Sequence, residues 1–225
     1  GVLLDDTMAG IHNGKVSLLE LSLTNVAATI VQTTYSNNTG IYHFNGVQGN
    51  YYIIKADVTD SIPATLPTYY PDAFFWGNSE QINLQSDTTG LDINILYQPT
   101  PPAQGTGLGK IYGYLLEGIG LRGPGSPIDS VIVGMTRPDS SGSIYMFDTT
   151  DSAGYFEFKN LPPGNYALYP DISGVPLDTA GWATISIAGT DTEKVNFVAD
   201  SNLIYVDSTV TTGILEYTSD LKLWP

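Results

Sequence analysis

The sequence predicts an all-β protein made of two tandem, seven-stranded Greek-key β-sandwiches. The first observation is a repeat: the stretch GIYHFNGVQGNYYII, which starts at Gly40, returns as GYFEFKNLPPGNYALY, which starts at Gly154. Each copy reads as a glycine turn, an alternating aromatic strand, a tight connection ending in Gly-Asn-Tyr, and a second alternating strand. A repeat of this kind is typical of duplicated modules.

Composition is the second observation, and the lack of a helical period is the third. The 225 residues include 15 Tyr, 7 Phe, 24 Gly and 14 Pro, so strand formers and turn residues are both frequent. No long stretch repeats its apolar residues at the helical period of about 3.6 residues. A chain of this length accommodates two domains of about 100 residues each.

The first module is expected to span 1–98. Its seven strands are predicted where apolar and aromatic residues alternate between turn signals, at 1–4, 15–23, 28–35, 41–45, 51–58, 81–84 and 91–97. The connection 59–80 is long, Pro-rich and aromatic, and we expect it to cross one end of the sandwich.

A linker at 99–107, rich in Pro and Gly, separates the modules. The second module is expected to span 108–200, with strands at 110–116, 130–136, 143–148, 155–159, 166–172, 182–187 and 194–199 and a turn at 138–143. The remaining tail, 201–225, is apolar enough to add a strand or to pack against the second module, and its last residues, DLKLWP, read as the opening of a further unit.

Aligning the two copies predicts which side chains face the cores. Alternate residues of a strand point to opposite faces. The inward residues are expected to be Tyr42, Phe44, Phe156 and Phe158, and the outward ones Ile41, His43, Tyr155 and Glu157.

Charge and composition exclude several partners. The net charge is −15, from 23 acidic and 8 basic residues. Nucleic acid and anionic membrane surfaces both require clustered Lys and Arg, so neither is expected to bind. The sequence has no Cys, which excludes disulfides and thiolate sites, and it has no apolar run long enough for a transmembrane helix. It also has no starting Met or signal peptide, and we expect a monomeric fragment of a longer chain.

The second half carries the residues of a known family. Its segments GKIYGYLLEG, GSPIDSVIV, TTDSAGYFEFKNLPPGNYALY and KVNFV resemble the carboxypeptidase regulatory-like domain and the collagen-adhesin B-type repeats of the prealbumin-like superfamily. In the first module only the middle third matches, with one residue fewer between Gly40 and Gly49 than between the corresponding glycines of the second. The stretch LPTYYPDAFFW, residues 66–76, is similar to a segment common in surface and secreted proteins of the Bacteroidetes.

The end of the chain carries a second resemblance. The run SDLKLWP resembles the junction at which secreted Bacteroidetes proteins pass into a C-terminal sorting domain of the type IX secretion system. The two resemblances together imply a secreted or cell-surface bacterial protein. They imply no peptidase activity, because carboxypeptidase regulatory-like domains accompany catalytic domains without being catalytic.

Catalytic groups are scarce. The two histidines, His12 and His43, lie in a loop and on the outer face of a predicted strand, and no nucleophile elbow is present. Two distant His without Cys cannot make a normal zinc site. The glutamates are scattered, and no region resembles the groove across which a glycosidase holds two carboxyl groups. We predict no catalytic residue and no enzymatic activity.

Calcium is the one cofactor that the sequence leaves open. Asp5 and Asp6 near the start, and Asp148 and Asp151 before the second repeat's glycine, offer oxygen ligands. The alternative is that a turn aspartate before Gly caps its own backbone.

An isopeptide crosslink, a speciality of collagen-adhesin B-type repeats, is not expected. The family's assisting acid is replaced by Lys55 in the first module and by Pro170 in the second. Without that acid, the lysine amine would stay protonated and could not attack.

These observations favour a non-catalytic extracellular spacer, stalk or adhesion module, with a surface polysaccharide or another surface protein as partner. The alternative is a carbohydrate-binding module that serves a polysaccharide-degrading enzyme. The group that separates them comprises Tyr69, Tyr70, Phe74, Phe75 and Trp76. A spacer would bury these rings, with 59–80 folded back over the core, whereas a sugar binder would expose two or three of them in a row. We also predict that the modules fold independently, because few residues are available to form a large shared interface.

Overall fold

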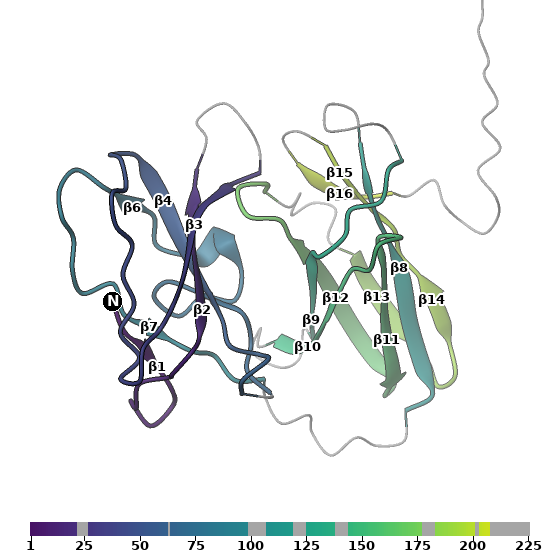
Figure 1. Cartoon of the computed structure of the whole chain (residues 1–225). Helices are drawn as coiled ribbons and strands as arrows, with labels where there is room; N and C mark the ends of the chain where they lie inside the picture. The colour runs from purple at the N-terminus through teal and green to yellow at the C-terminus, as the bar shows by residue number, and fades with distance from the viewer. Residues whose placement is uncertain are drawn as a thin grey trace, which may run out of the picture.

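The computed structural model describes residues 1–21, 27–62, 64–98, 107–118, 125–137, 144–176, 183–200 and 203–207. Within these ranges the chain is nearly all β, and its strands form four sheets. Among the described strands, none pairs with a strand of the other module, and the two modules stand side by side (Figure 1). Among the described residues, no helix has the length and apolar character to cross a membrane.

The first module is a five-stranded sheet facing a short parallel pair. The sheet has the order β3-β2-β4-β5, and β6 pairs with β4. Its strands are β2 (Lys15–Glu20), β3 (Thr29–Tyr35), β4 (Tyr51–Asp57), β5 (Thr68–Tyr69) and β6 (Ile82–Asn83). The parallel pair is β1 (Leu3–Leu4) with β7 (Ile93–Asn94). Buried residues of both layers, such as Leu3, Ile54 and Ile93, form one core cluster.

The second module is a fuller sandwich. One sheet has the order β10-β9-β12-β13 and the other β11-β8-β15-β16, with β14 pairing in parallel with β8. The strands are β8 (Gly109–Glu117), β9 (Ile132–Thr136), β10 (Ile144–Thr149), β11 (Tyr155–Leu161), β12 (Gly164–Asp171), β13 (Ala183–Ile187), β14 (Thr192–Lys194), β15 (Phe197–Ala199) and β16 (Ile204–Val206). The strand predicted in the tail is therefore present as β16. The turn at 138–143, most of the linker and the DLKLWP segment lie outside the described residues.

The two copies of the repeat fold alike. Gly40 and Gly154 both have positive φ, at 81° and 72°, a backbone conformation that favours glycine. Tyr42, Phe156 and Phe158 are buried and Phe44 is half-buried, as the alternation predicts. In each copy a tyrosine hydroxyl donates to the carbonyl four residues earlier: Tyr52 to Gln48 at 2.8 Å and Tyr166 to Pro162 at 2.6 Å.

These tyrosine hydrogen bonds correct the alignment of the copies. Tyr52 is the structural equivalent of Tyr166, whereas Tyr51, which the shared Gly-Asn-Tyr triplet aligns with Tyr166, is exposed. The spacing from Gly40 to Tyr52 equals that from Gly154 to Tyr166, so no residue is lost between the copies. With this register Lys55 corresponds to Tyr169, so Lys55 and Pro170 do not occupy equivalent positions in the two modules.

One predicted strand of the first module is absent. Residues 41–45 make only an isolated bridge between Ile41 and Val2 and otherwise belong to no strand. The equivalent strand of the second module, β11, pairs along most of its length with β8, whereas β1 has only two residues. A strand at 41–45 therefore has no neighbouring backbone with which to form a ladder.

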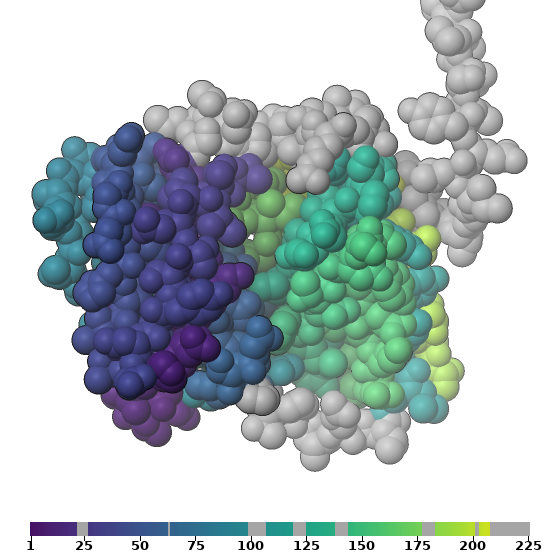
Figure 2. Space-filling view, in the orientation of Figure 1, coloured from purple at the N-terminus to yellow at the C-terminus, as the bar shows by residue number. Residues whose placement is uncertain are grey.

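The facing sheets of the two modules are covered on both sides. Val133 and Met135 of β9 belong to the second core, yet the alternate residues Gly134 and Thr136 are also buried. In the first module, Ile54 of β4 points into the core and its neighbour Ile53 packs on the opposite face. In the space-filling view, the blue atoms of the first module abut the green atoms of the second (Figure 2). The two modules therefore share an interface, and their independent folding stays a prediction.

Candidate functional site: the interface between the modules

The aromatic segment 69–76 lies between the modules rather than across one end of the first sandwich. It runs from β5 into a short 3-10 turn, Trp76–Asn78. Tyr69 is fully buried and Phe74 is 8% exposed, while Tyr70, Phe75 and Trp76 are half-buried. The five rings therefore do not form an exposed row. The expected burial occurs, but the second module covers much of the segment.

One half of the interface is apolar. Phe74 packs beside Phe147 of β10, with ring centroids 6.3 Å apart, and Phe75 packs beside Tyr169 of β12 at 5.2 Å. Both phenylalanines lie over Gly134, where a Cβ atom would come within 2.7 Å of the Phe74 ring. Glycine in the middle of β9 therefore permits the close approach of these two rings. The cluster also contains Leu66, Leu96, Ile132 and Ile144.

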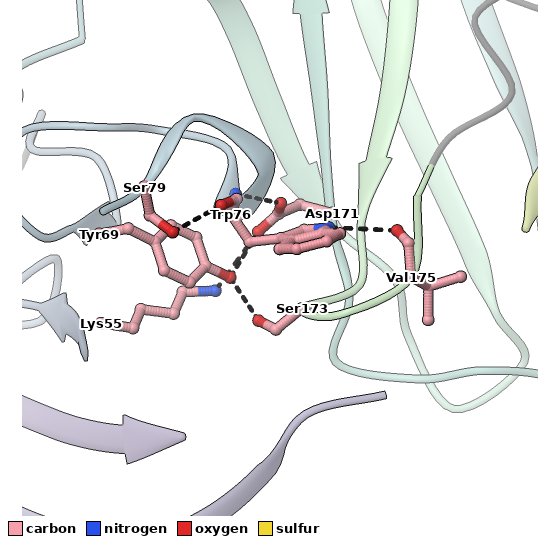
Figure 3. A network of polar contacts seen from close by, with 7 residues as sticks. All are labelled: Lys55, Tyr69, Trp76, Ser79, Asp171, Ser173 and Val175. Carbon is pink, nitrogen blue, oxygen red and sulfur yellow. Dashed lines mark hydrogen bonds and ion pairs between the residues drawn. The ribbon is translucent and has the colours of Figure 1, made fainter. Parts of the chain in front are cut away.

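The other half of the interface is a polar network centred on Asp171, the last residue of β12. Its Oδ2 accepts a hydrogen bond of 2.7 Å from the Tyr69 hydroxyl, and its Oδ1 accepts one of 3.0 Å from the Trp76 amide (Figure 3). The Lys55 ammonium lies 3.8 Å from Oδ2 and 4.8 Å from the centre of the Tyr69 ring. All three partners come from the first module, so one carboxylate joins the strands β4 and β5 and the 3-10 turn across the interface.

Further hydrogen bonds surround this network. The Tyr69 hydroxyl lies 2.6 Å from Ser173 Oγ, and the Trp76 indole N–H donates to the Val175 carbonyl at 3.1 Å. The Ala28 amide, just before β3, donates to the Ser173 carbonyl at 2.7 Å. The loop after β12 is therefore attached to the first module by backbone as well as side-chain groups.

Burial dominates the electrostatics of the network. The side chain of Asp171 is only 2% exposed, and its desolvation raises its pKa above the ordinary value. The nearby Lys55 charge and the hydrogen bonds from Trp76 and Tyr69 act in the opposite direction. Burial and then the charge of Asp171 raise the pKa of Tyr69 well above its usual range, so the phenol keeps its proton and donates.

Two of the four aspartates that the sequence offers for calcium, Asp5 and Asp151, act as turn caps. Asp5 Oδ1 accepts from the Thr7 amide, the Thr7 hydroxyl and the Ala9 amide at 2.7–2.9 Å. Asp151 Oδ1 accepts from the Ala153 and Tyr155 amides at 2.8 and 2.9 Å. Because amide donors already point at these oxygens, capping is the role that the structure displays.

The other two aspartates do not join a cluster. Asp148 accepts from the Glu157 amide at 2.7 Å and from the Thr149 amide at 2.9 Å, and Asp6 is exposed. In the parts of the chain that the structure describes, no three His, Cys, Asp or Glu side chains lie together in a way that could hold a metal. The first and second pairs of aspartates belong to different modules.

Sequence reasoning singled out the aromatic segment but missed Asp171 and Gly134. The available signal was the pair of strands in which alternation fails, because SVIVGM and YALYPD carry apolar residues on both faces. Runs of this kind indicate a sheet covered on both sides. An acidic residue at the end of such a run then needs buried partners.

No protein-family model and no curated protein matches the chain. Among solved structures, the minor pilin GBS52 of Streptococcus agalactiae aligns with a TM-score of 0.31 and 14% identity over 91% of this chain and 87% of that one. A streptococcal ancillary pilin aligns with a TM-score of 0.30 and 11% identity over 89% of this chain and 60% of that one. The major pilin RrgB of Streptococcus pneumoniae aligns with a TM-score of 0.29 and 13% identity, over 89% and 47%. The chain thus spans about half to nine-tenths of these pilins. The likeness is remote, and the fold described above rests on the strand topology itself.

Proposed function

We propose that this chain is a non-catalytic spacer or adhesion unit of a secreted or cell-surface bacterial protein, in which two β-sandwich modules act as one rigid body. The observation that carries the proposal is that the segment 69–76 is buried between the modules and hydrogen-bonded to Asp171 of the second module. A spacer must hold the angle between its modules, and a buried interface with directional hydrogen bonds supplies that constraint.

A structural role for the buried acid supports the non-catalytic part of the proposal. The two carboxylate oxygens of Asp171 are engaged by Tyr69, Trp76 and Lys55, and the residue lies between packed sheets. The histidines His12 and His43 are both exposed on the first module. Export by a type IX route and a Bacteroidetes origin stay predictions from the sequence resemblance, as does a partnership with a surface protein or polysaccharide.

Carbohydrate binding remains the alternative, but this interface does not favour it. Stacking on a sugar needs two or three rings in an exposed row, whereas Tyr69 and Phe74 are closed between the modules. Retention of the chain on an insoluble polysaccharide, with Trp76→Ala abolishing retention and preserving stability, would favour the alternative over the spacer.

The test of the spacer proposal is a distance measurement between the modules. Because the sequence has no Cys, spin labels attached at Thr33→Cys and Thr184→Cys, both exposed strand positions, are unique. We expect a single narrow distance distribution by pulsed electron paramagnetic resonance. Gly134→Val should broaden it by displacing the Phe74 ring. A broad distribution in the otherwise unchanged chain would contradict the proposal.

A further inference from the structure

The five-stranded sheet of the second module has an outer face that is separate from the interface. Alternate residues of β8 and β11, such as Ile111 and Phe156, point into the core, so the residues between them lie on the opposite face of the sheet. The contacts with the first module are made by the other sheet, through β9, β10 and β12. In Figure 1, β8 and β14 stand on the side of the second module that is away from the first.

Seven residues of this outer face form a cluster that we call the tyrosine–lysine patch. Its members are Lys110, Tyr112 and Tyr114 of β8, Tyr155, Glu157 and Lys159 of β11, and Lys194 of β14. The strand register places Tyr155 opposite Tyr114. The Tyr155 ring packs beside both other rings, with its centroid 6.2 Å from that of Tyr112 and 5.4 Å from that of Tyr114. The three rings are half-buried and therefore form one continuous aromatic surface.

Two of the rings hold an ammonium group. The Lys110 ammonium lies 5.1 Å from the centre of the Tyr112 ring, and the Lys194 ammonium lies 5.4 Å from the centre of the Tyr114 ring. At these distances a cation is attracted to the ring. Lys194 makes no ion pair with another described residue, although the chain contains 23 acidic residues and only 8 basic ones. Its charge is therefore available to an anion from outside the chain.

Glu157 neutralises only part of the positive charge of the patch. It forms ion pairs with Lys110 and Lys159, and the Tyr155 hydroxyl donates to its Oε2 at 2.7 Å. These contacts lower the pKa of Glu157 to about 2, so its carboxylate is charged at neutral pH. Three lysines against one glutamate leave an excess of positive charge on a chain whose net charge is −15.

The neighbouring carboxylates do not cancel this excess. Asp148 lies at the rim, where it accepts from the Glu157 amide at 2.7 Å, and counting it still leaves more lysines than acids. Glu193 pairs with Ile111 of β8, so it points to the other side of β14. Asp191 accepts from an amide of its own turn. Because salt screens charges over about 8 Å at physiological ionic strength, the local excess decides which ligand the patch attracts.

We propose that the tyrosine–lysine patch binds an anionic polysaccharide, whose sugar units carry carboxylate or sulfate groups. The apolar faces of the sugars stack on the tyrosine rings, and the anionic groups pair with Lys194 and Lys159. A neutral sugar would use only the rings and a simple anion only the lysines, so the contact between rings and ammonium groups favours a ligand that has both features. The inference rests on the adhesion part of the proposed function, for which it names the class of partner.

The test measures binding of the full chain to four immobilised polymers on a biosensor. Polygalacturonate and dextran sulfate supply sugars with carboxylate or sulfate groups, dextran supplies sugars without charge, and polyglutamate supplies charge without sugars. We expect saturable binding to at least one of the first two, at least about tenfold tighter than to dextran or polyglutamate, and weaker as salt is added. The comparison of the first two polymers identifies the anionic group.

Two variants assign the binding to the patch. Lys194→Ala and Tyr114→Leu should each weaken binding about tenfold, because one removes a charged partner and the other a stacking ring. The matched control is Lys15→Ala: Lys15 is an exposed lysine of β2 in the first module, so the net charge changes equally but the affinity should not. Melting temperatures show that each variant is folded.

Three results would overturn the proposal. They are no binding to either anionic polysaccharide, equal binding to polyglutamate, and an equal loss of affinity in Lys194→Ala and Lys15→Ala. Equal binding to polyglutamate would show that the patch recognises charge alone, as in binding to an acidic protein. The distance measurement between the modules does not involve this face, so the spacer proposal stands or fails separately.

Discussion

Phe74→Ala is the sharpest test of the interface. Phe74 is 8% exposed and belongs to the cluster that joins Leu66 to Ile144 of β10, apart from the two module cores. Truncating a buried phenylalanine costs about 3–5 kcal/mol of unfolding free energy. Because the ring lies against Phe147 and Gly134, we expect most of this loss to come from contacts with the second module.

The assay is calorimetric unfolding of the full chain and of a fragment containing 1–98. We expect the full chain to lose about 3–5 kcal/mol on Phe74→Ala and its unfolding to separate into two transitions, whereas the fragment should change by about 1 kcal/mol or less. Phe158→Ala is the matched control: the ring is 1% exposed in the second core, so it should destabilise the second module without altering the first. An equal loss in the fragment and in the full chain would refute the reasoning.

Two further predictions concern the interface, and a third concerns the Asp151 turn of the second module. Gly134→Val should lower the unfolding free energy by about 1–3 kcal/mol, because the added side chain overpacks against Phe74. The control Thr184→Val, on the exposed side of β13, should change it by about 0.5 kcal/mol or less. Equal effects of the two substitutions would contradict the contact between Gly134 and Phe74. Burial raises the pKa of Asp171, so this carboxyl group keeps its proton to higher pH in the folded chain than in the unfolded one, whose pKa is about 4. The contribution of Asp171 to the unfolding free energy should therefore fall as pH rises through that raised pKa. Asp171→Asn should weaken this dependence of the unfolding free energy on pH, as measured by urea titrations at several pH values. An unchanged pH dependence would contradict the role of Asp171. Asp151→Ala should lower the unfolding free energy by about 1–2 kcal/mol, because two hydrogen bonds to the backbone are lost. The loss should be the same with and without calcium. If calcium raises the melting temperature of the unchanged chain and not that of the variant, Asp151 belongs to a metal site instead.

Much of the fold follows from local sequence patterns. The strands β4, β9, β12 and β13 begin and end within a few residues of their predicted bounds, because alternation and turn residues act over short distances. The inward direction of Phe156 and Phe158 follows from the period of two residues in a strand. The Asp151 cap follows from an aspartate three residues before a glycine.

The errors share a different cause. Residues 41–45 alternate as a strand should, but a strand also needs a neighbouring backbone, and in this module β1 is too short to supply it. The shared Gly-Asn-Tyr triplet gave the wrong alignment of the two copies. Tyr51 and Tyr52 are adjacent, and the sequence alone does not show which of their hydroxyl groups donates to the Gln48 carbonyl. The segment 59–80 lies elsewhere than expected, over one end of the sandwich, because the sequence does not show where the second module packs.

The sequence by itself determined the class of fold, the duplication, the turns and the core-facing side of each repeated strand, since these depend on residues close together in the chain. Only the tertiary structure decided what covers the second side of each facing sheet. Asp171 and Tyr69 are far apart in sequence, and nothing local to either residue requires their hydrogen bond. An alternating pattern shows that one face of a strand must be buried. Which element buries it depends on packing between segments that are distant in the chain, and neither sequence identifies the other.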